Sequence, residues 1–155
     1  MRTNTFEHLD GKGLKIGIVA SRFNGEMMEG LLQGCLAALI ETGVAQEDVT
    51  TIRVPGSFET PHGVWMLLQR GGFDAIIAMG IIIKGETRHD ELIADAVARA
   101  IMRFNTKQEV PVLFGIVTAE TIEQARVRSG EGEDNRGRDA ALAAVEMALL
   151  RRSFT

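Results

Sequence analysis

The stretch from residue 75 to residue 104, AIIAMGIIIKGETRHDELIADAVARAIMRF, contains the two patterns that decide the fold. Ala75–Ile83 is an apolar run rich in β-branched residues, which predicts a buried strand, and Lys84 and Gly85 end it. The residues that follow have the i, i+3, i+4, i+7 spacing of an amphipathic helix: His89, Leu92, Ile93, Ala96, Val97, Ala100, Ile101 and Phe104. A buried strand that leads directly into a helix is the repeating unit of α/β proteins.

The same alternation extends in both directions from this stretch. Strands apolar throughout their length and separated by helices predict a parallel sheet covered on both faces. The expected fold class is therefore α/β, a three-layer α/β/α sandwich around a four-stranded, parallel, doubly wound sheet of the flavodoxin-like type. Phe6–Leu9 is a candidate for an extra N-terminal edge strand. The other predicted strands are Lys15–Ala20, Val49–Val54 and Val112–Val117, and the other helices are 28–40, Phe58–Gln69, Thr121–Arg128 and Asp139–Arg152.

Composition limits the class of protein before any motif is considered. The 155 residues suit one domain over 1–155, which is large enough to fold without a disulfide or a metal. A formal net charge of −4, with scattered lysine and arginine, gives no basic footprint for nucleic acid. Cys35 is the single cysteine and lies in an apolar helical pattern, so we predict a core residue in a reducing compartment. No apolar run approaches the ~20 residues of a membrane span, and the cytoplasm is the expected location.

Several motifs that accompany this fold class are absent. There is no G-x-x-x-x-G-K-[ST] sequence, and the turn after the first strand reads Ser-Arg-Phe-Asn-Gly instead of a dinucleotide-binding G-x-G-x-x-G. No H-E-x-x-H, C-x-x-C or other His/Cys cluster predicts a metal site. A response-regulator domain needs acidic residues at the ends of strands one and three, where this chain has Ala20 and Ile83. These absences argue against a P-loop, a dinucleotide-binding fingerprint and a metal site.

Ligands of doubly wound sheets bind beyond the carboxyl ends of the strands. His89 opens a helix at that edge, where the positive end of the helix dipole disfavours a protonated imidazole. A neutral imidazole that exchanges protons near neutral pH suits acid–base catalysis, but a structural histidine that bonds a carbonyl fits equally well. The edge corresponds to four loops: Ser21–Gly25, Pro55–Glu59, Ile81–His89 and Thr118–Thr121.

The segment Gly85-Glu86-Thr87 before the same helix offers backbone N–H groups to an anion. By itself, Thr87 is more typical of a helix N-cap. An anion site also needs a cation opposite. Arg128 is one candidate, in competition with Arg126, Arg136 and Arg138.

Aromatic and polar side chains follow the first two predicted strands. Phe23 could stack on a heterocycle or cover the end of the core, and Asn24 offers both a donor and an acceptor. In the loop after the second strand, the amides of Ser57 and Phe58 point out of a helix start. Glu59 either accepts hydroxyl protons from a polyol or complements the helix dipole.

Together these segments resemble the lumazine synthase family over nearly the whole chain. Ser-Arg-Phe-Asn at 21–24 is similar to the family's [AS]-R-F-N turn, and Val-Pro-Gly-Ser-Phe-Glu at 54–59 to its V-P-G-[AS]-[FY]-E loop. Gly-Glu-Thr-Arg-His at 85–89 resembles the segment that carries the family's histidine. Further matches are Val-Pro-Val-Leu-Phe-Gly-Ile-Val-Thr at 110–118, Glu-Gln-Ala at 123–125 and Asn-Arg-Gly at 135–137.

The resemblance implies a reaction of riboflavin biosynthesis without a metal or redox cofactor. Lumazine synthases condense 5-amino-6-(D-ribitylamino)uracil with 3,4-dihydroxy-2-butanone 4-phosphate to give 6,7-dimethyl-8-ribityllumazine, phosphate and water. The resemblance assigns acid–base chemistry to His89, and the phosphate to Thr87, the Glu86 amide and Arg128. It assigns the uracil and its ribityl chain to Phe23, Asn24, Ser57, Phe58, Glu59, Phe114 and the backbone of Ile81, Ile82 and Ile83.

The resemblance also implies a homo-oligomer built from pentamers, with each site between neighbouring subunits. Phe114 and Arg128 would come from one chain and the other site residues from the next. From its position within a strand alone, Phe114 is predicted to belong to the core. Family members form pentamers, decamers or hollow shells, and riboflavin synthase is a further candidate partner. The chain departs from the family pattern at Arg88 and Asp90, which flank the histidine, and at Arg136, where a lysine is usual.

Two other classes of function are also compatible with this fold. A non-catalytic flavin- or lumazine-binding protein, or a shell-forming scaffold, could retain the architecture. Another flavodoxin-like phosphate-ester enzyme would require the motif matches to be coincidental. An active synthase is favoured because a scaffold needs none of the residues retained together here: Phe23, Glu59, Thr87, His89, Phe114 and Arg128.

Overall fold

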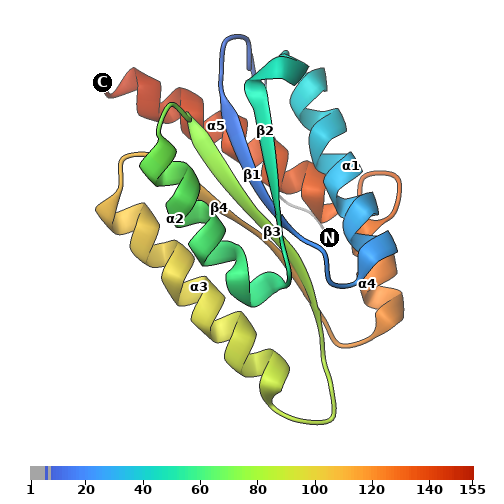
Figure 1. Ribbon diagram of the computed structural model, residues 1–155. Coiled ribbons are helices and arrows are strands. Elements are labelled where there is room, and N and C mark those ends of the chain that lie inside the picture. Colours follow the sequence, from blue (N-terminus) through green and yellow to red (C-terminus); the bar gives the residue numbers. More distant parts are fainter. Residues whose placement is uncertain (1–5, 7) are drawn as a thin grey trace.

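The computed structural model describes residue 6 and residues 8–155, and strands and helices alternate along this chain (Figure 1). The strands are β1 (Ile16–Ser21), β2 (Val49–Val54), β3 (Ala75–Ile83) and β4 (Val112–Ala119). The helices are α1 (Gly25–Glu41), α2 (Thr60–Arg70), α3 (His89–Lys107), α4 (Ile122–Ser129) and α5 (Arg136–Ser153), with short 3₁₀ helices η1 (Gln46–Asp48) and η2 (Ser57–Glu59). Within the described residues, no helix is both long and apolar enough to cross a membrane.

All strand pairs are parallel, and the strands lie in the order β2-β1-β3-β4. Helices α2 and α3 cover one face of the sheet, and α1, α4 and α5 cover the other, as Figure 1 shows. This arrangement confirms the predicted α/β sandwich around a four-stranded, doubly wound sheet. The sheet has two edges, β2 and β4, and the β4 edge becomes important for the site.

The additional edge strand predicted at Phe6–Leu9 is not part of this sheet. Phe6, His8 and Leu9 lie in no strand, and residue 7 lies outside the described residues. The segment contributes side chains instead of backbone pairing, because Leu9 packs against the core and Phe6 lines a pocket beside β4. A short apolar run indicates that its side chains are buried, but buried side chains can also belong to a segment that pairs with no strand.

Three helices begin two or three residues from the start that the apolar pattern predicts, and the first of them, α1, begins at Gly25 instead of residue 28. The final helix starts at Arg136 instead of Asp139, because the Asn135 side chain accepts hydrogen bonds from the N–H groups of Gly137 and Arg138. Such a cap satisfies donors that have no partner within the helix. The helix predicted from Phe58 is preceded by the 3₁₀ turn η2 and becomes α-helical at Thr60.

Apolar side chains cover both faces of the sheet because successive residues of a strand point to opposite sides. Ile77 packs in one cluster with residues of α1 and α5, such as Leu31 and Val145. The neighbouring Ile76 packs on the other face, in a cluster that includes Val64 of α2. Burial on both faces is the reason the strands are apolar throughout.

Cys35 lies in the first of these clusters and is completely buried, which confirms that it belongs to the core. Burial raises the pKa of its thiol from 9.0 to about 12. Since the folded-state pKa lies above the unfolded one, the stabilising contribution is complete below pH 9 and is lost as the pH rises towards 12.

We expect Cys35 to resist thiol reagents at pH 8 in the native protein and to react fully after denaturation, because the thiolate is the reactive species. Above pH 9 the free energy of unfolding should fall by up to about 1.4 kcal/mol per pH unit through this group. Urea titrations at several pH values measure the effect. A Cys35→Ala variant should lack this part of the pH dependence, and an unchanged dependence would contradict the assignment.

Candidate active site

The loops after β1, β2 and β3 are held together at the carboxyl ends of these strands. The Arg22 amide donates a hydrogen bond to the Val54 carbonyl (2.8 Å), and the Phe23 amide donates to the Pro55 carbonyl (3.1 Å). The first loop therefore continues the pairing of β1 with β2 beyond the strands. Phe23 is 70% exposed, so its ring projects into solvent and does not cover the end of the core.

Asn24 connects the same loop to β3. It has a left-handed backbone conformation (φ 68°), and its side chain does not cap α1. Its amide group donates instead to the Ile81 carbonyl at 3.0 Å. The donor of Asn24 and the acceptor of Ile81 are therefore used within the protein, which leaves the side-chain oxygen of Asn24 to meet a ligand.

The end of β3 offers an open backbone edge on its β1 side. β1 pairs with β3 only as far as Ala20 and Met79, whereas β4 pairs with β3 as far as Ile83. The Lys84 amide donates to the Ala119 carbonyl of β4. The N–H and C=O of one residue in a strand point to the same side, and this side alternates from residue to residue, so those of Ile81 and Ile83 face the β1 side, beyond the end of β1.

The loop after β2 contains Ser57, Phe58 and Glu59, which form η2. Ser57 is buried, and its hydroxyl lies so close to Gly80 of β3 that a methyl group at Gly80 would overlap it. Phe58 is 62% exposed, and Glu59 is also exposed. Ser57 therefore fixes the loop against the sheet, while the two residues after it face outward.

Glu86, Thr87 and His89 are all exposed at the start of α3, as expected for residues that open a helix. The Thr87 hydroxyl accepts a hydrogen bond from the His89 amide at 3.3 Å, so part of its capacity is used in the first turn. The Asp90 carboxylate accepts one from the Gly85 amide, also at 3.3 Å. These two contacts close the loop between β3 and α3.

Charged residues around this loop are paired with one another. Lys84 forms an ion pair of 3.2 Å with Glu120 in the loop after β4, and this hydrogen bond and charge raise the pKa of Lys84. Arg88 forms an ion pair with Glu91 at 3.3 Å and is directed along the helix. Of the two charged residues that flank His89, Arg88 is therefore paired with Glu91 of α3, and Asp90 is bonded to the Gly85 amide of the loop.

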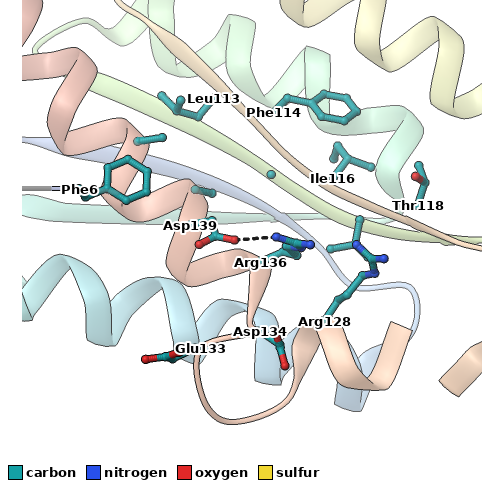
Figure 2. A pocket seen from close by; sticks show the side chains of 14 residues that line it. Phe6, Leu113, Phe114, Ile116, Thr118, Arg128, Glu133, Asp134, Arg136 and Asp139 are labelled. Atoms are coloured by element: carbon teal, nitrogen blue, oxygen red, sulfur yellow. Dashed lines mark hydrogen bonds and ion pairs between the residues drawn. The ribbon is translucent and has the colours of Figure 1, made fainter. Parts of the chain in front are cut away.

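A separate pocket of about 880 Å³ lies beside the edge strand β4, as Figure 2 shows, and we name it the β4 pocket. Arg128 and Thr118 lie at one end of this pocket, and Phe6 and Leu113 lie at the other. Its lining residues are Phe6, Leu113, Phe114, Gly115, Ile116, Val117, Thr118, Arg128, Glu133, Asp134, Arg136, Asp139, Ala140 and Ala143.

The prediction from its position that Phe114 is a core residue is wrong, because its side chain is 45% exposed in the β4 pocket. β4 is the last strand of the sheet, and no further strand lies beside it among the described residues. An apolar run does not distinguish an edge strand from a central one. The ring at Phe114 is therefore a large apolar surface on an open edge.

Arg136 and Asp139 are among the residues of the β4 pocket that the sequence pattern does not assign to the site. The pattern offers Arg136 only as an alternative cation, and it places Asp139 in a helix without a role. An ion pair of 3.1 Å between them directs both side chains to the pocket (Figure 2). Their i, i+3 spacing on one helix is the signal that could have identified the pair.

The structure thus divides the predicted site residues into two groups. Phe114 and Arg128 line the β4 pocket. None of the other predicted residues lines it: Phe23, Asn24, Ser57, Phe58, Glu59, Ile81, Ile82, Ile83, Glu86, Thr87 and His89 lie at the ends of β1, β2 and β3. Within residues 6 and 8–155, no group of three or more His, Cys, Asp or Glu side chains is arranged to hold a metal ion.

Comparison with known proteins identifies similar chains along nearly the full length. The family model described as 6,7-dimethyl-8-ribityllumazine synthase matches residues 13–152. The protein of that name from Pyrococcus furiosus is 48% identical over 155 residues, which cover 99% of this chain and 96% of the relative. Those from Thermotoga neapolitana and Aquifex aeolicus are 43% and 41% identical, over 93% and 94% of this chain and 87% and 95% of their own lengths.

Proposed function

Because this chain belongs to the 6,7-dimethyl-8-ribityllumazine synthase family, we propose how its own residues divide the work of that reaction. The enzyme acts in riboflavin biosynthesis and condenses ribitylaminouracil with butanone phosphate. An amine adds to a ketone, phosphate is eliminated, and the ring closes with loss of water. Each step moves protons, and two bound molecules must be brought together.

One observation carries the proposal: the residues needed for the two substrates lie in two places on one chain. Arg128 and Phe114 line the β4 pocket, whereas His89 and Phe23 belong to the group at the ends of β1–β3. A complete site therefore forms where the β4 pocket of one copy meets the other group on a neighbouring copy. Heterologous contacts form rings when the rotation between copies closes, and the proposed pentamer is a ring of this kind.

The proposed phosphate site combines Arg128 of the β4 pocket with the loop before α3. Arg128 is half-buried, and its guanidinium can bond two phosphate oxygens in a fixed geometry. In the neighbouring copy, the Glu86 amide and the Thr87 hydroxyl lie at the start of α3, where backbone N–H groups favour an anion. Phosphate would thus be held across the interface between two copies.

The uracil is proposed to bind against the open edge of β3. The N–H of Ile81 and the N–H and C=O of Ile83 face that edge and can pair with the ring's carbonyl and N–H groups, while the Ile81 carbonyl is held by Asn24. Phe23 would stack on the flat ring, with Phe114 of the neighbouring copy closing the other side. The ribityl hydroxyls would bond to the backbone of Ser57 and Phe58 and to the Glu59 carboxylate.

His89 is the proposed acid–base group because it stands at the start of α3, next to the proposed phosphate ligands. It would take a proton from the attacking amine and return it to a departing oxygen. Much of the acceleration would come from holding the two substrates in contact. We propose the cytoplasm as the site of action and riboflavin synthase, which consumes the product, as a candidate partner.

A direct assay tests this proposal. Purified protein is mixed with both substrates, and lumazine absorbance is followed against a reaction without enzyme. We expect the wild-type protein to accelerate product formation, and His89→Ala to lower kcat by roughly tenfold to a hundredfold, at or below the low end for a positioned acid–base group. A His62→Ala variant is the matched control, because His62 stacks on Trp65 of α2 and is absent from both groups of site residues.

The outcomes separate the alternatives. An unchanged rate in His89→Ala would remove this residue from the mechanism while leaving the activity in place. No acceleration by folded, oligomeric wild-type protein would favour a ligand-binding or scaffold member of the family.

A further inference from the structure

Asn135 is a polar side chain with only 3% exposure that connects three helices. Its amide group lies within hydrogen-bond distance of the carbonyls of Gly30 (3.0 Å), Ser129 (3.3 Å) and Gly130 (2.8 Å). Its side-chain oxygen accepts from the amides of Gly137 (2.8 Å) and Arg138 (3.2 Å). Every hydrogen bond described for this side chain is with backbone.

These contacts lie directly beside the cations of the β4 pocket. Ser129 is the last residue of α4 and follows Arg128, and Asn135 itself precedes Arg136 at the start of α5. The amide group of Asn135 therefore holds the end of the helix that carries Arg128, and its oxygen holds the helix that carries Arg136. Gly30 ties both helix ends to α1.

Close packing leaves Asn135 little freedom to move. A methyl group at Gly34 of α1 would overlap the Asn135 side chain, and one at Gly30 would overlap the Ser129 carbonyl oxygen. Glycine at these two positions allows α1 to approach close enough for the hydrogen bonds to form. The positions of the α4 and α5 ends are thus determined together.

Helix capping explains only part of this arrangement. A cap needs the side-chain oxygen, which any Asp, Ser or Thr could supply to the amides of Gly137 and Arg138. The contacts with the carbonyls of Ser129 and Gly130 need a hydrogen-bond donor as well. An ionised Asp has no donor, and the hydroxyl of Ser or Thr is too close to the backbone to reach these carbonyls. The effect of these contacts is on α4, not on the helix that is capped.

We propose that Asn135 is a positioning residue, whose amide group holds the end of α4 so that Arg128 meets the phosphate of the substrate. This inference rests on the proposed function of Arg128. It requires that loss of the amide group selectively weakens binding of the phosphorylated substrate, and that this effect depends on Arg128. A residue that only stabilised the fold would affect both substrates, or neither.

Two variants separate the cap from the contacts with α4. Asn135→Ser keeps an oxygen that can cap α5 but is too short to reach the carbonyls of α4, and Asn135→Ala removes both functions. Asn105→Ala is the matched control, because the Asn105 side chain also bonds backbone, at Ile101 and Val112, but at the opposite end of β4. If Asn135→Ala does not fold, Asn135→Ser alone decides the question.

The experiment is a double-mutant cycle with Arg128→Ala, in which KM and kcat are measured for each substrate. We expect Asn135→Ser to raise KM for butanone phosphate roughly tenfold, because the Arg128 guanidinium would no longer be aligned with the phosphate. The KM for the uracil should change little. In the Arg128→Ala background the same substitution should have no further effect on the KM for butanone phosphate, and Asn105→Ala should leave both KM values unchanged. The wild-type rate tests the proposed function separately. If the wild type is active, three results would overturn the role of Asn135. They are an equal rise in KM for both substrates, no rise in KM, and a rise that persists in the Arg128→Ala background.

Discussion

Replacing Arg128 by alanine is expected to raise KM for butanone phosphate by roughly a hundredfold or more, because two charge-assisted hydrogen bonds to phosphate are lost together. Four arginines near the end of the chain could supply this charge. The structure pairs three of them with carboxylates: Arg126 with Glu123, Arg136 with Asp139, and Arg138 with Glu41. Arg128 is the remaining one, and it lines the β4 pocket.

Selectivity is the decisive feature of this prediction. The KM for the uracil should change little in Arg128→Ala, since its proposed ligands lie in the other group of residues. Arg126→Ala is the control, because Arg126 lies on the same helix but is absent from the lining of the β4 pocket. A loss of affinity confined to the uracil would contradict the role of Arg128.

The same variant tests whether each site is shared between two copies. When Arg128→Ala and His89→Ala chains are co-expressed, mixed oligomers should contain some interfaces that receive both substitutions and others that receive neither. Those with neither should be fully active, so the mixed preparation should exceed the combined activity of the two variants. Activity no higher than that combination would place Arg128 and His89 in the same chain's site.

The second large effect is expected from Gly137→Ala in the first turn of α5. A methyl group at this position would overlap the Leu31 carbonyl oxygen of α1 and approach the Asn135 oxygen to 2.9 Å. The principal neighbour is backbone, which cannot rotate away, so α1 and α5 would have to separate. We expect a loss of about 3 kcal/mol or more in the free energy of unfolding, at or above the upper end for overpacking.

Urea unfolding monitored by circular dichroism measures this loss. Gly25→Ala is the control, because Gly25 also lies in the first turn of a helix but has no atom near the added methyl group. Its stability should change by no more than about 1 kcal/mol. An unfolding midpoint of Gly137→Ala close to that of the wild type would show that α1 and α5 can separate at little cost.

Local sequence was sufficient for the elements of secondary structure and for their class. β2 and β3 have the predicted ends, and α3 begins at His89 as predicted. The reason is that a strand buried on both faces is apolar throughout, whereas a helix with one buried face repeats its apolar residues at i, i+3 and i+4. The predicted start of α5 and the extra edge strand were wrong because capping and strand pairing depend on residues outside the local pattern.

The motifs of the loops predicted the family, which the comparisons confirm, and they supplied the candidate residues of the site. Only the tertiary structure decided that β4 is an edge and that Phe114 is exposed there. It also showed that Arg126, Arg136 and Arg138 are paired with carboxylates, and it separated Phe114 and Arg128 from the other predicted site residues. The physical reason is that a local pattern records whether a side chain is buried. Which surface a side chain faces depends on the order of the strands and on ion pairs between distant residues.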